Sequence, residues 1–344
     1  MPVGCTRITV FAVSGLMAAL SWIVISSRIM AGAYNVGEGL EFEVIAAVVI
    51  GGTSLAGGSG SMIGTFLGVL FMGLLSNGMI ACAMTFVIIS GDIDVSVGSA
   101  VAWSSSLLGV LAIKQHWPLI GAVFFVLALG ILIHSTAGWI RVKWSIPAFV
   151  VTLALFMSYK GLAKVITKAY PITPFPDSFS FWGQGYIAKI IPVPAVLMLV
   201  TVAIFYFLST RTVFGRSVYS VGGNEEASRL SGIPVGRTRI MVFALSGLMA
   251  ALGGVIISSR IMAGAYNVGE GLEFEVIAAV VIGGTSLAGG SGSMIGTFLG
   301  VLFMGLLSNG MTLMGVDPYW QEVARGLILL FAVLISAWQN PIKK

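Results

Sequence analysis

Long apolar runs separated by short polar stretches fill almost the whole chain. Runs of about 20 residues are long enough to cross roughly 30 Å of hydrocarbon, so they predict membrane-spanning helices. Shorter runs next to glycine clusters are candidates for re-entrant pieces, which occur at membrane depth only when packed in protein or lining a cavity. Counting both kinds gives roughly eleven apolar segments and predicts an all-α, polytopic membrane protein. The clearest spans cover residues 8–27, 118–133, 146–157, 191–208, 240–259 and 322–338.

The longest polar stretch, residues 211–239, lies between two of these spans. Its arginines flank and interleave a short helix-like run, and short basic loops stay on the cytoplasmic side of a membrane. The stretch is therefore expected to face the cytoplasm. The same rule predicts a cytoplasmic C terminus, which ends in two lysines, and a cytoplasmic N terminus, which carries Arg7.

Composition supports a membrane protein and argues against several other classes. Of 344 residues, 57% are hydrophobic and only 9% are charged, and the mean hydropathy is +1.02. The formal charge of +5 comes from basic residues placed singly between apolar runs, so no nucleic-acid-binding face is expected. Cys5 and Cys82 give neither a disulfide framework nor a zinc spacing. No metal, cofactor or enzymatic activity is predicted.

A sequence repeat relates the two ends of the chain. Residues 2–79 align without a gap on residues 234–311, and the copies are identical from residue 25 onward. Ancient repeats in transporters keep only weak similarity, so this copy indicates a recent duplication, a gene fusion or an artefact of gene assembly. The seven differing pairs are Cys5/Arg237, Thr9/Met241, Val13/Leu245, Ser21/Gly253, Trp22/Gly254, Ile23/Val255 and Val24/Ile256.

Each copy ends in glycine-rich sequence. The glycine cluster at residues 51–58 lacks the Gly-Lys-Ser/Thr ending of a phosphate-binding P-loop, so it predicts a closely packed helix break and no ATP hydrolysis by that route. The next apolar run carries a G-x-x-x-G spacing in both copies, which lets helix backbones approach closely. The predicted packing residues are Gly64, Gly68, Gly296 and Gly300.

Two aspartates lie inside apolar sequence in the segment 91–99. Inserting each of Asp92 and Asp94 into a membrane costs about 3 kcal/mol, so both should face a cavity, a partner or an interface. Asp94 and Ser96 are also good N-cap residues for the apolar run that follows. Lining a translocation path and capping a helix are both compatible with the sequence. His116 and His134 are isolated in the chain, and without nearby carboxylates neither is expected to bind a metal or relay protons.

Three motifs together resemble the permease subunits of ABC importers for ribose and related sugars. They are MTFVIISGDIDVSVGS at 84–99, GRSVYSVGGNEEASRLSGI at 215–233 and IAAVVIGGTSLAGGSGSMIGTFLGVLFMGLLSNG at 277–310. The resemblance implies that residues 80–344 form the permease domain, a homodimer or pseudo-dimer in the lipid of the bacterial inner membrane. It also implies two further partners, a periplasmic sugar-binding protein and a cytoplasmic ATPase subunit.

In such permeases a short cytoplasmic coupling helix docks in a cleft of the ATPase. The corresponding run here has glutamates at its start and an arginine near its end, which suits the helix dipole. A solvated loop without a partner is the alternative interpretation. The residues that match the coupling helix are Gly222, Gly223, Asn224, Glu225, Glu226, Ala227, Ser228, Arg229, Leu230, Ser231 and Gly232.

The chain departs from the family pattern at two places. The family usually has Gly-Gly-Ile-Asp in the first motif, whereas here Asp92 replaces the second glycine. In addition, residues 1–79 replace the usual short tail and first span. If this segment crosses the membrane three times, residues 77–80 lie on the outer side and the rest of the permease keeps its usual orientation.

Two other functions are compatible with the sequence. A secondary transporter or facilitator would use Asp92, Asp94 or the repeated glutamates of residues 38–43 and 270–275 as proton sites. The other is an inactive fusion product. Because the duplicated segment begins at Pro234, the N-terminal copy carries no second coupling helix, and two ATPase sites would need two chains.

Overall fold

The computed structural model of the chain is almost entirely helical, which confirms the predicted fold class. It describes residues 3–29, 44, 48, 60–62, 75–187, 191–314 and 316–339. Within these ranges, seven helices are long and apolar enough to cross a membrane. The longer helices are α1 (Val3–Ile29), α4 (Leu75–Ile89), α5 (Val97–Gly109), α6 (Leu119–Trp144), α7 (Ala148–Thr167), α9 (Val193–Arg211), α12 (Val235–Ile261), α14 (Met294–Leu313) and α15 (Pro318–Gln339).

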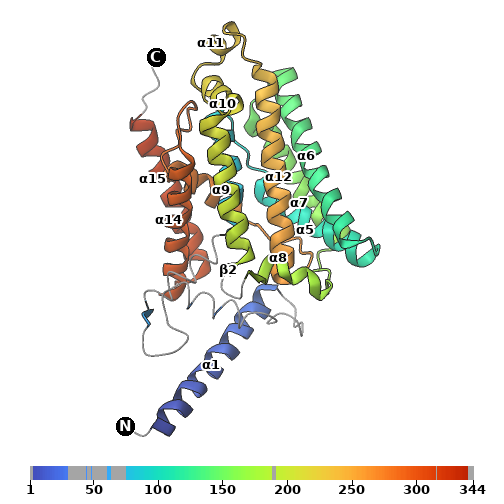
Figure 1. Cartoon of the computed structure of the whole chain (residues 1–344), viewed down its shortest axis with the longest axis vertical. Helices are drawn as coiled ribbons and strands as arrows, with labels where there is room; N and C mark the ends of the chain where they lie inside the picture. Colours follow the sequence, from blue (N-terminus) through green and yellow to red (C-terminus); the bar gives the residue numbers. More distant parts are fainter. Residues whose placement is uncertain are drawn as a thin grey trace.

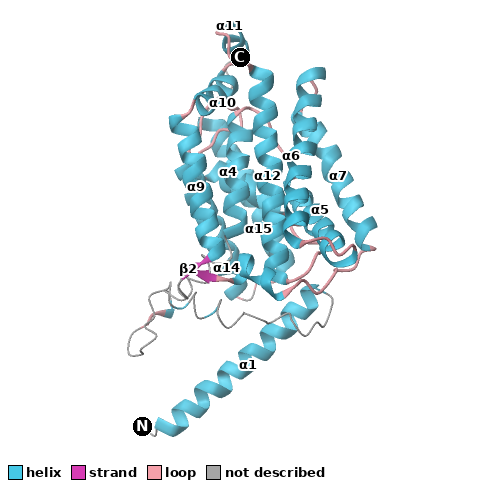
Figure 2. Ribbon diagram, turned by 45° about the vertical axis from the view of Figure 1, so that its right-hand side comes forward, coloured by secondary structure: helices cyan, strands magenta, loops and turns pink. Residues whose placement is uncertain are grey.

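Shorter elements occupy the ends and the interior of the helical bundle. Helices α10 and α11 cover one end, whereas α8 and a small antiparallel hairpin lie at the other (Figures 1 and 2). We call these the α11 end and the α8 end. The shorter elements are η1 (Val110–Lys114), η2 (Asp177–Phe179), α8 (Ser180–Gln184), β1 (Tyr186–Ile187), β2 (Ile191–Pro192), α10 (Val213–Gly223), α11 (Glu225–Leu230) and α13 (Leu272–Ile282).

Helices α6 and α7 continue further than the sequence predicted. The expected spans ended at residues 133 and 157, whereas the helices run to Trp144 and Thr167. Polar side chains caused the error. His134 is buried inside the bundle, and Arg141 and Lys143, which the sequence places between two spans, belong to the last turn of α6, where cations suit the negative end of the helix dipole.

Two stretches of non-helical backbone lie between helices of the bundle. Residues 90–96 connect α4 to α5 and are mostly buried, whereas residues 262–271 connect α12 to α13 and are buried only at 262–265. The second stretch runs along α5, because a Cβ added to Gly269 would lie only 2.7 Å from the carbonyl oxygen of Gly98 in the first turn of that helix. Irregular backbone of this kind is tolerated at membrane depth because protein surrounds it.

The glycines of α14 face α13 at very short distance. A Cβ added to Gly296 would clash with the carbonyl of Gly283, and a Cβ added to Gly300 would clash with that of Ala279. Only glycine lets the two backbones approach so closely. The counterparts in the N-terminal copy, Gly64 and Gly68, lie outside the described residues.

Helix α1 does not share the environment of α12, although the two sequences nearly match. Helix α12 packs against α4, α5 and α6, whereas α1 projects from the α8 end with 0% of its window Arg7–Val24 buried (Figure 1). The copies differ where α12 packs most closely, because a Cβ on Gly254 would lie 2.7 Å from the Val101 carbonyl oxygen and 2.8 Å from the Ser104 Cβ. Trp22 stands at the equivalent position of α1. An indole would overlap α5 there, so the N-terminal copy cannot replace α12 in this packing.

We therefore expect Gly254→Trp to destabilise the permease by more than the ~1–3 kcal/mol typical of overpacked cores, since the indole would meet backbone atoms of α5. The matched control is Trp22→Gly, because Trp22 is 39% exposed and should tolerate truncation. Thermal unfolding of the purified chain in detergent measures both effects. A Gly254→Trp variant as stable as the wild type would contradict the packing argument.

Candidate functional site

Polar side chains form two clusters around the non-helical segment 90–96. One cluster surrounds Asp94 in the interior of the bundle, and the other connects Asp92 with α11. Each contains an aspartate that the sequence singled out, so the geometry of each cluster tests what these residues can do.

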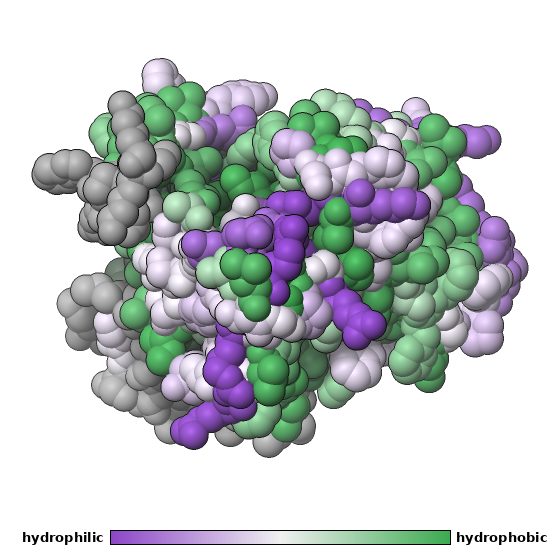
Figure 3. All heavy atoms as spheres, turned by 90° about the horizontal axis from the view of Figure 1, so that it is seen from above, coloured by the Kyte–Doolittle hydropathy of each residue, from purple (hydrophilic) through white to green (hydrophobic). Residues whose placement is uncertain are grey.

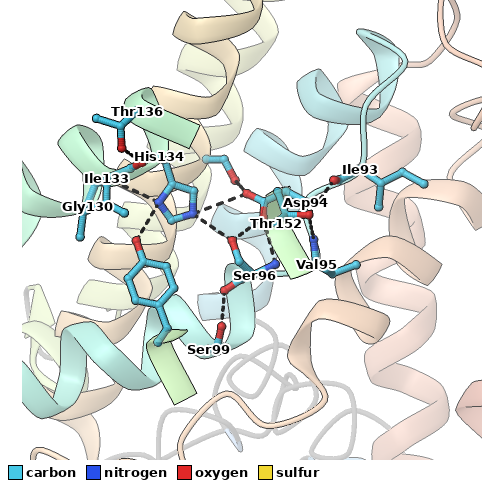
Figure 4. Close-up of polar contacts among 12 residues, drawn as sticks. Ile93, Asp94, Val95, Ser96, Ser99, Gly130, Ile133, His134, Thr136 and Thr152 are labelled. Carbon is cyan, nitrogen blue, oxygen red and sulfur yellow. Dashed lines mark hydrogen bonds and ion pairs between the residues drawn. The ribbon is translucent and has the colours of Figure 1, made fainter. Parts of the chain in front are cut away.

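Asp94 is fully buried, and both of its carboxylate oxygens accept hydrogen bonds (Figure 4). Oδ1 accepts from the backbone N–H of Ser96 at 2.9 Å and from its hydroxyl at 2.6 Å. Oδ2 accepts from the hydroxyl of Ser246 at 2.7 Å. Asp94 thus anchors the segment 90–96 to α12, and in this conformation it does not face an open path.

The capping role expected for these residues takes a different form. Ser96 is the residue before α5, but its side chain makes no capping hydrogen bond. Its hydroxyl donates to Asp94 instead, and the Asp94 carboxylate holds the Ser96 N–H as in an Asx turn. Thr152 of α7 adds further support, since its hydroxyl contacts the Ile93 carbonyl at 3.2 Å and the Val95 N–H at 3.3 Å. Side chains therefore supply the partners that a helix would otherwise provide.

His134 has a carboxylate neighbour that its position in the sequence did not reveal. Its Nε2 lies 3.6 Å from Asp94 Oδ2 and 3.3 Å from Ser96 Oγ. Because the Ser96 proton points to Asp94, Nε2 is assigned a hydrogen that it donates to these oxygens. Nδ1 lies 3.2 Å from the Gly130 carbonyl and 3.3 Å from the Tyr159 hydroxyl. Nδ1 could donate to the carbonyl or accept from the hydroxyl, depending on the tautomer. Because Asp94 lies next to the ring, the expectation that His134 has no nearby carboxylate is wrong.

Alternating charges lead from the segment 90–96 to α11. Asp92 Oδ1 accepts a hydrogen bond from Arg141 Nε at 3.1 Å, and Oδ2 lies 3.3 Å from Arg239 Nε. A terminal guanidinium nitrogen of Arg239 lies 2.9 Å from a carboxylate oxygen of Glu225. The other oxygen of Glu225 accepts from Arg229 at 3.1 Å. We call these five residues the charge ladder.

Burial divides the charge ladder into an inner and an outer part. The side chains of Asp92 and Arg239 are 2% and 6% exposed, whereas that of Glu225 is 38% exposed. Burial disfavours the charge of Glu225, but the Arg239 guanidinium and its hydrogen bond outweigh this effect and hold the pKa of the Glu225 carboxyl below its ordinary value. Asp92 is paired on both sides, with Arg141 and Arg239.

Helix α11 stands outside the bundle and is organised by its own residues. The Asn224 side chain accepts a hydrogen bond from the N–H of Ala227 at 2.9 Å and so caps the helix. Gly232 turns the chain after the helix with a φ of 80°. Leu230 is 81% exposed, and seen from this end, hydrophilic side chains cross the middle of the face (Figure 3). The helix therefore presents an apolar side chain beside charged ones.

The first residue of the expected coupling segment, Gly222, packs against the bundle, whereas Gly223 and Asn224 are exposed. A Cβ on Gly222 would clash with the Ile89 carbonyl and lie 2.7 Å from the Gly290 nitrogen. The nearby hydroxyl of Tyr219 donates to the Gly292 carbonyl at 2.9 Å. A Cβ on Gly223 would lie 3.9 Å from Gly290, which is ordinary contact. Gly222 thus has a packing role that its motif did not indicate.

The glutamates of the second repeat copy are dispersed. Glu270 forms an exposed ion pair with Lys160 at 2.8 Å, and Glu275 pairs with Arg325. Glu273 is buried, and its Oε2 has no hydrogen-bond partner. Among the described residues, no group of three or more His, Cys, Asp or Glu could hold a metal ion.

The Asp94 cluster makes a direct prediction for stability. Asp94→Ala would leave His134 and two serine hydroxyls without their buried acceptor, and we expect it to cost about 3–5 kcal/mol. Ser246→Ala removes one hydrogen bond to a charged group and should cost about 1.5–3 kcal/mol. Thermal or denaturant unfolding in detergent compares the two. If Asp94→Ala proved the milder substitution, the anchoring role would be refuted.

The sequence is similar to several curated bacterial transport proteins. It is 40% identical over 262 residues to the ribose import permease protein RbsC of Bacillus subtilis (strain 168), covering 76% of this chain and 81% of the relative. It is 38% identical over 264 residues to RbsC of Escherichia coli (strain K12), covering 76% and 82%. It is 34% identical over 320 residues to the xylose transport system permease protein XylH of the same strain, covering 76% and 81%.

A structural comparison and a family profile complete these findings. A metal-chelate type ABC transporter solved in an inward-facing conformation aligns over 88% of this chain and 97% of its own, with a TM-score of 0.48 and 17% identity. The profile described as branched-chain amino acid transport system / permease component matches residues 1–83 and 77–333. This profile and the identity to full-length relatives show that the chain belongs to the branched-chain amino acid transport system / permease component family.

Proposed function

We propose that this chain is the membrane-embedded permease subunit of an ABC importer for ribose or a related sugar. Its relatives carry the names of ribose and xylose permeases, and its bundle of apolar helices suits a multi-pass protein of the bacterial inner membrane. The sequence has no P-loop ending, so a separate subunit supplies ATP hydrolysis. The observation that carries the proposal is α11, a short charged helix held outside the bundle.

Helix α11 is the docking element for the ATPase in this proposal. Its N-terminal end is capped by Asn224, and Glu225 and Arg229 pair across one turn, so the helix needs no partner to keep its shape. Leu230 is exposed on this helix, and its full burial in a partner cleft would contribute about 1.5–3 kcal/mol to the binding free energy.

This assignment orients the bundle in the membrane. With α11 in the cytoplasm, the α8 end faces the periplasm, where the sugar-binding protein delivers its cargo. Helix α4 begins toward the α8 end, with Gly78 beside Met198 near the start of α9, which agrees with the expected outer position of residues 77–80. The orientation of the N terminus and the crossings of residues 1–79 stay predictions.

The passage of sugar requires the interior of the bundle to change its arrangement. The segments 90–96 and 262–271 are the natural places for this, because their backbone is held by side chains rather than by a continuous helix. Asp94 and Ser96 hold the first segment in the present conformation and would re-pair when the path opens. Because the sequence contains the segment 222–232 only once, we propose that a transporter with two ATPase sites contains two permease chains.

Buried Glu273 favours one alternative, a secondary transporter that uses a carboxylate as its proton site. Its Oε2 lacks a hydrogen-bond partner, and unpaired buried carboxylates mark proton pathways in transporters. An uptake assay in liposomes that contain the permease alone distinguishes the two functions. Sugar uptake without any ATPase would favour the secondary transporter.

The docking proposal is tested by affinity capture of the importer's ATPase on the full-length permease. Combining Glu225→Gln, Glu226→Gln and Arg229→Gln with Leu230→Asp should lower the amount captured at least tenfold, which corresponds to about 1.4 kcal/mol of binding free energy. A matched control is Glu270→Gln with Lys160→Gln, an exposed ion pair away from α11. Undiminished capture by the α11 variant would reject the docking site.

A further inference from the structure

We propose that the charge ladder conveys displacement of α11 to the non-helical segment 90–96, with Arg239 and Asp92 as the positioning residues. This inference deepens the proposed function and rests on it for the source of the movement, which is the ATPase docked on α11. The contacts themselves belong to the permease, so they can be examined without the ATPase.

The first step is the path of contacts from solvent to the interior. Glu225 lies in the first turn of α11, Arg239 on α12, and Asp92 in the non-helical segment. The two joining ion pairs measure 2.9 Å and 3.3 Å. Asp92 is two residues from Asp94, the anchor of the same segment. A shift of Glu225 therefore has a short charged route to the place where the backbone leaves helical geometry.

The second step concerns the strength of the inner contacts. Arg239 is 5% exposed and lies between two carboxylates, so moving α11 away would leave a buried guanidinium with only one of them. Buried charges are screened little by salt, and separating them from a partner is strongly unfavourable. By contrast, Arg229 is 62% exposed, and its pair with Glu225 is a surface contact of small energy. The link through Arg239 is the one that resists separation.

The third step distinguishes the charged contacts of the ladder from an apolar packing contact in the same region. Gly222 also lies against Ile89 at the end of α4, so α10 contacts the same region through its backbone. That contact does not depend on charge and survives substitution of the ladder side chains. Arg141 adds α6 to the ladder through Asp92, so the same displacement would reach two transmembrane elements.

The first experiment uses the full-length permease alone, with hydrogen exchange measured by mass spectrometry on peptides covering residues 90–96. Glu225→Gln should increase exchange there about fivefold, within the range for coupled networks. In an Arg239→Gln background the same substitution should have no further effect, because the link is already broken. Glu226→Gln is the matched control, since Glu226 is exposed on the same helix and is outside the ladder. Unchanged exchange in Glu225→Gln, or an equal increase in both backgrounds, would overturn the proposal.

The second experiment adds the ATPase and compares ATP-bound with nucleotide-free complexes. Wild type should show an ATP-dependent change in exchange over residues 90–96, and Asp92→Asn and Arg239→Gln should lose it while still capturing the ATPase. If the change persists in both variants, or if either releases the ATPase, the ladder is not a transmitting element. Failure of the docking proposal is recognised separately, because it appears as undiminished capture by the α11 variant.

Discussion

Between α4 and α5 the backbone leaves helical geometry inside the bundle, and the hydrogen bonds given up there must be replaced by neighbouring helices. The replacements are specific. Asp94 holds the N–H of Ser96 and is itself held by Ser246 of α12, while Thr152 of α7 contacts the backbone on both sides of Asp94. Side chains that are costly in an apolar helix thus make a helix break affordable at membrane depth. Helices α6, α7 and α12 all contribute side chains to this break.

Helices α6 and α12 both meet the two clusters, α6 through His134 and Arg141. Ser246 reaches the Asp94 cluster, and Arg239, two turns earlier, reaches the charge ladder, so one straight helix fixes the relative positions of the two. Its fit also depends on close contact with α5 at Gly254. A single helix that contacts both the exposed helix α11 and a buried backbone break is suited to couple them.

The sequence could predict the class of fold because hydrophobic length alone determines which helices can cross a membrane. It also indicated the short polar helix and the costly aspartates. It could not predict their partners, since Ser96 and His134 are 38 residues apart and Asp94 and Ser246 are 152 apart. The expected spans ended too early, at residues 133 and 157, because polar and charged side chains inside α6 and α7 resemble loop residues when their partners are unknown. A buried histidine looks like a loop residue until its carboxylate partner is known.

The repeated helix shows that a nearly identical sequence does not by itself reproduce these contacts. Helix α1 retains Arg7 and Ser14, the equivalents of Arg239 and Ser246, but both are exposed. The acids that partner Arg239 lie outside the duplicated segment, in residues 90–96 and in α11, and α1 carries Trp22 where close packing needs glycine. A second ladder would therefore need a second segment 90–96 and a second α11. The repeat of residues 234–311 therefore gives the chain a further apolar helix, α1, without the contacts that α12 makes with residues 90–96 and α11.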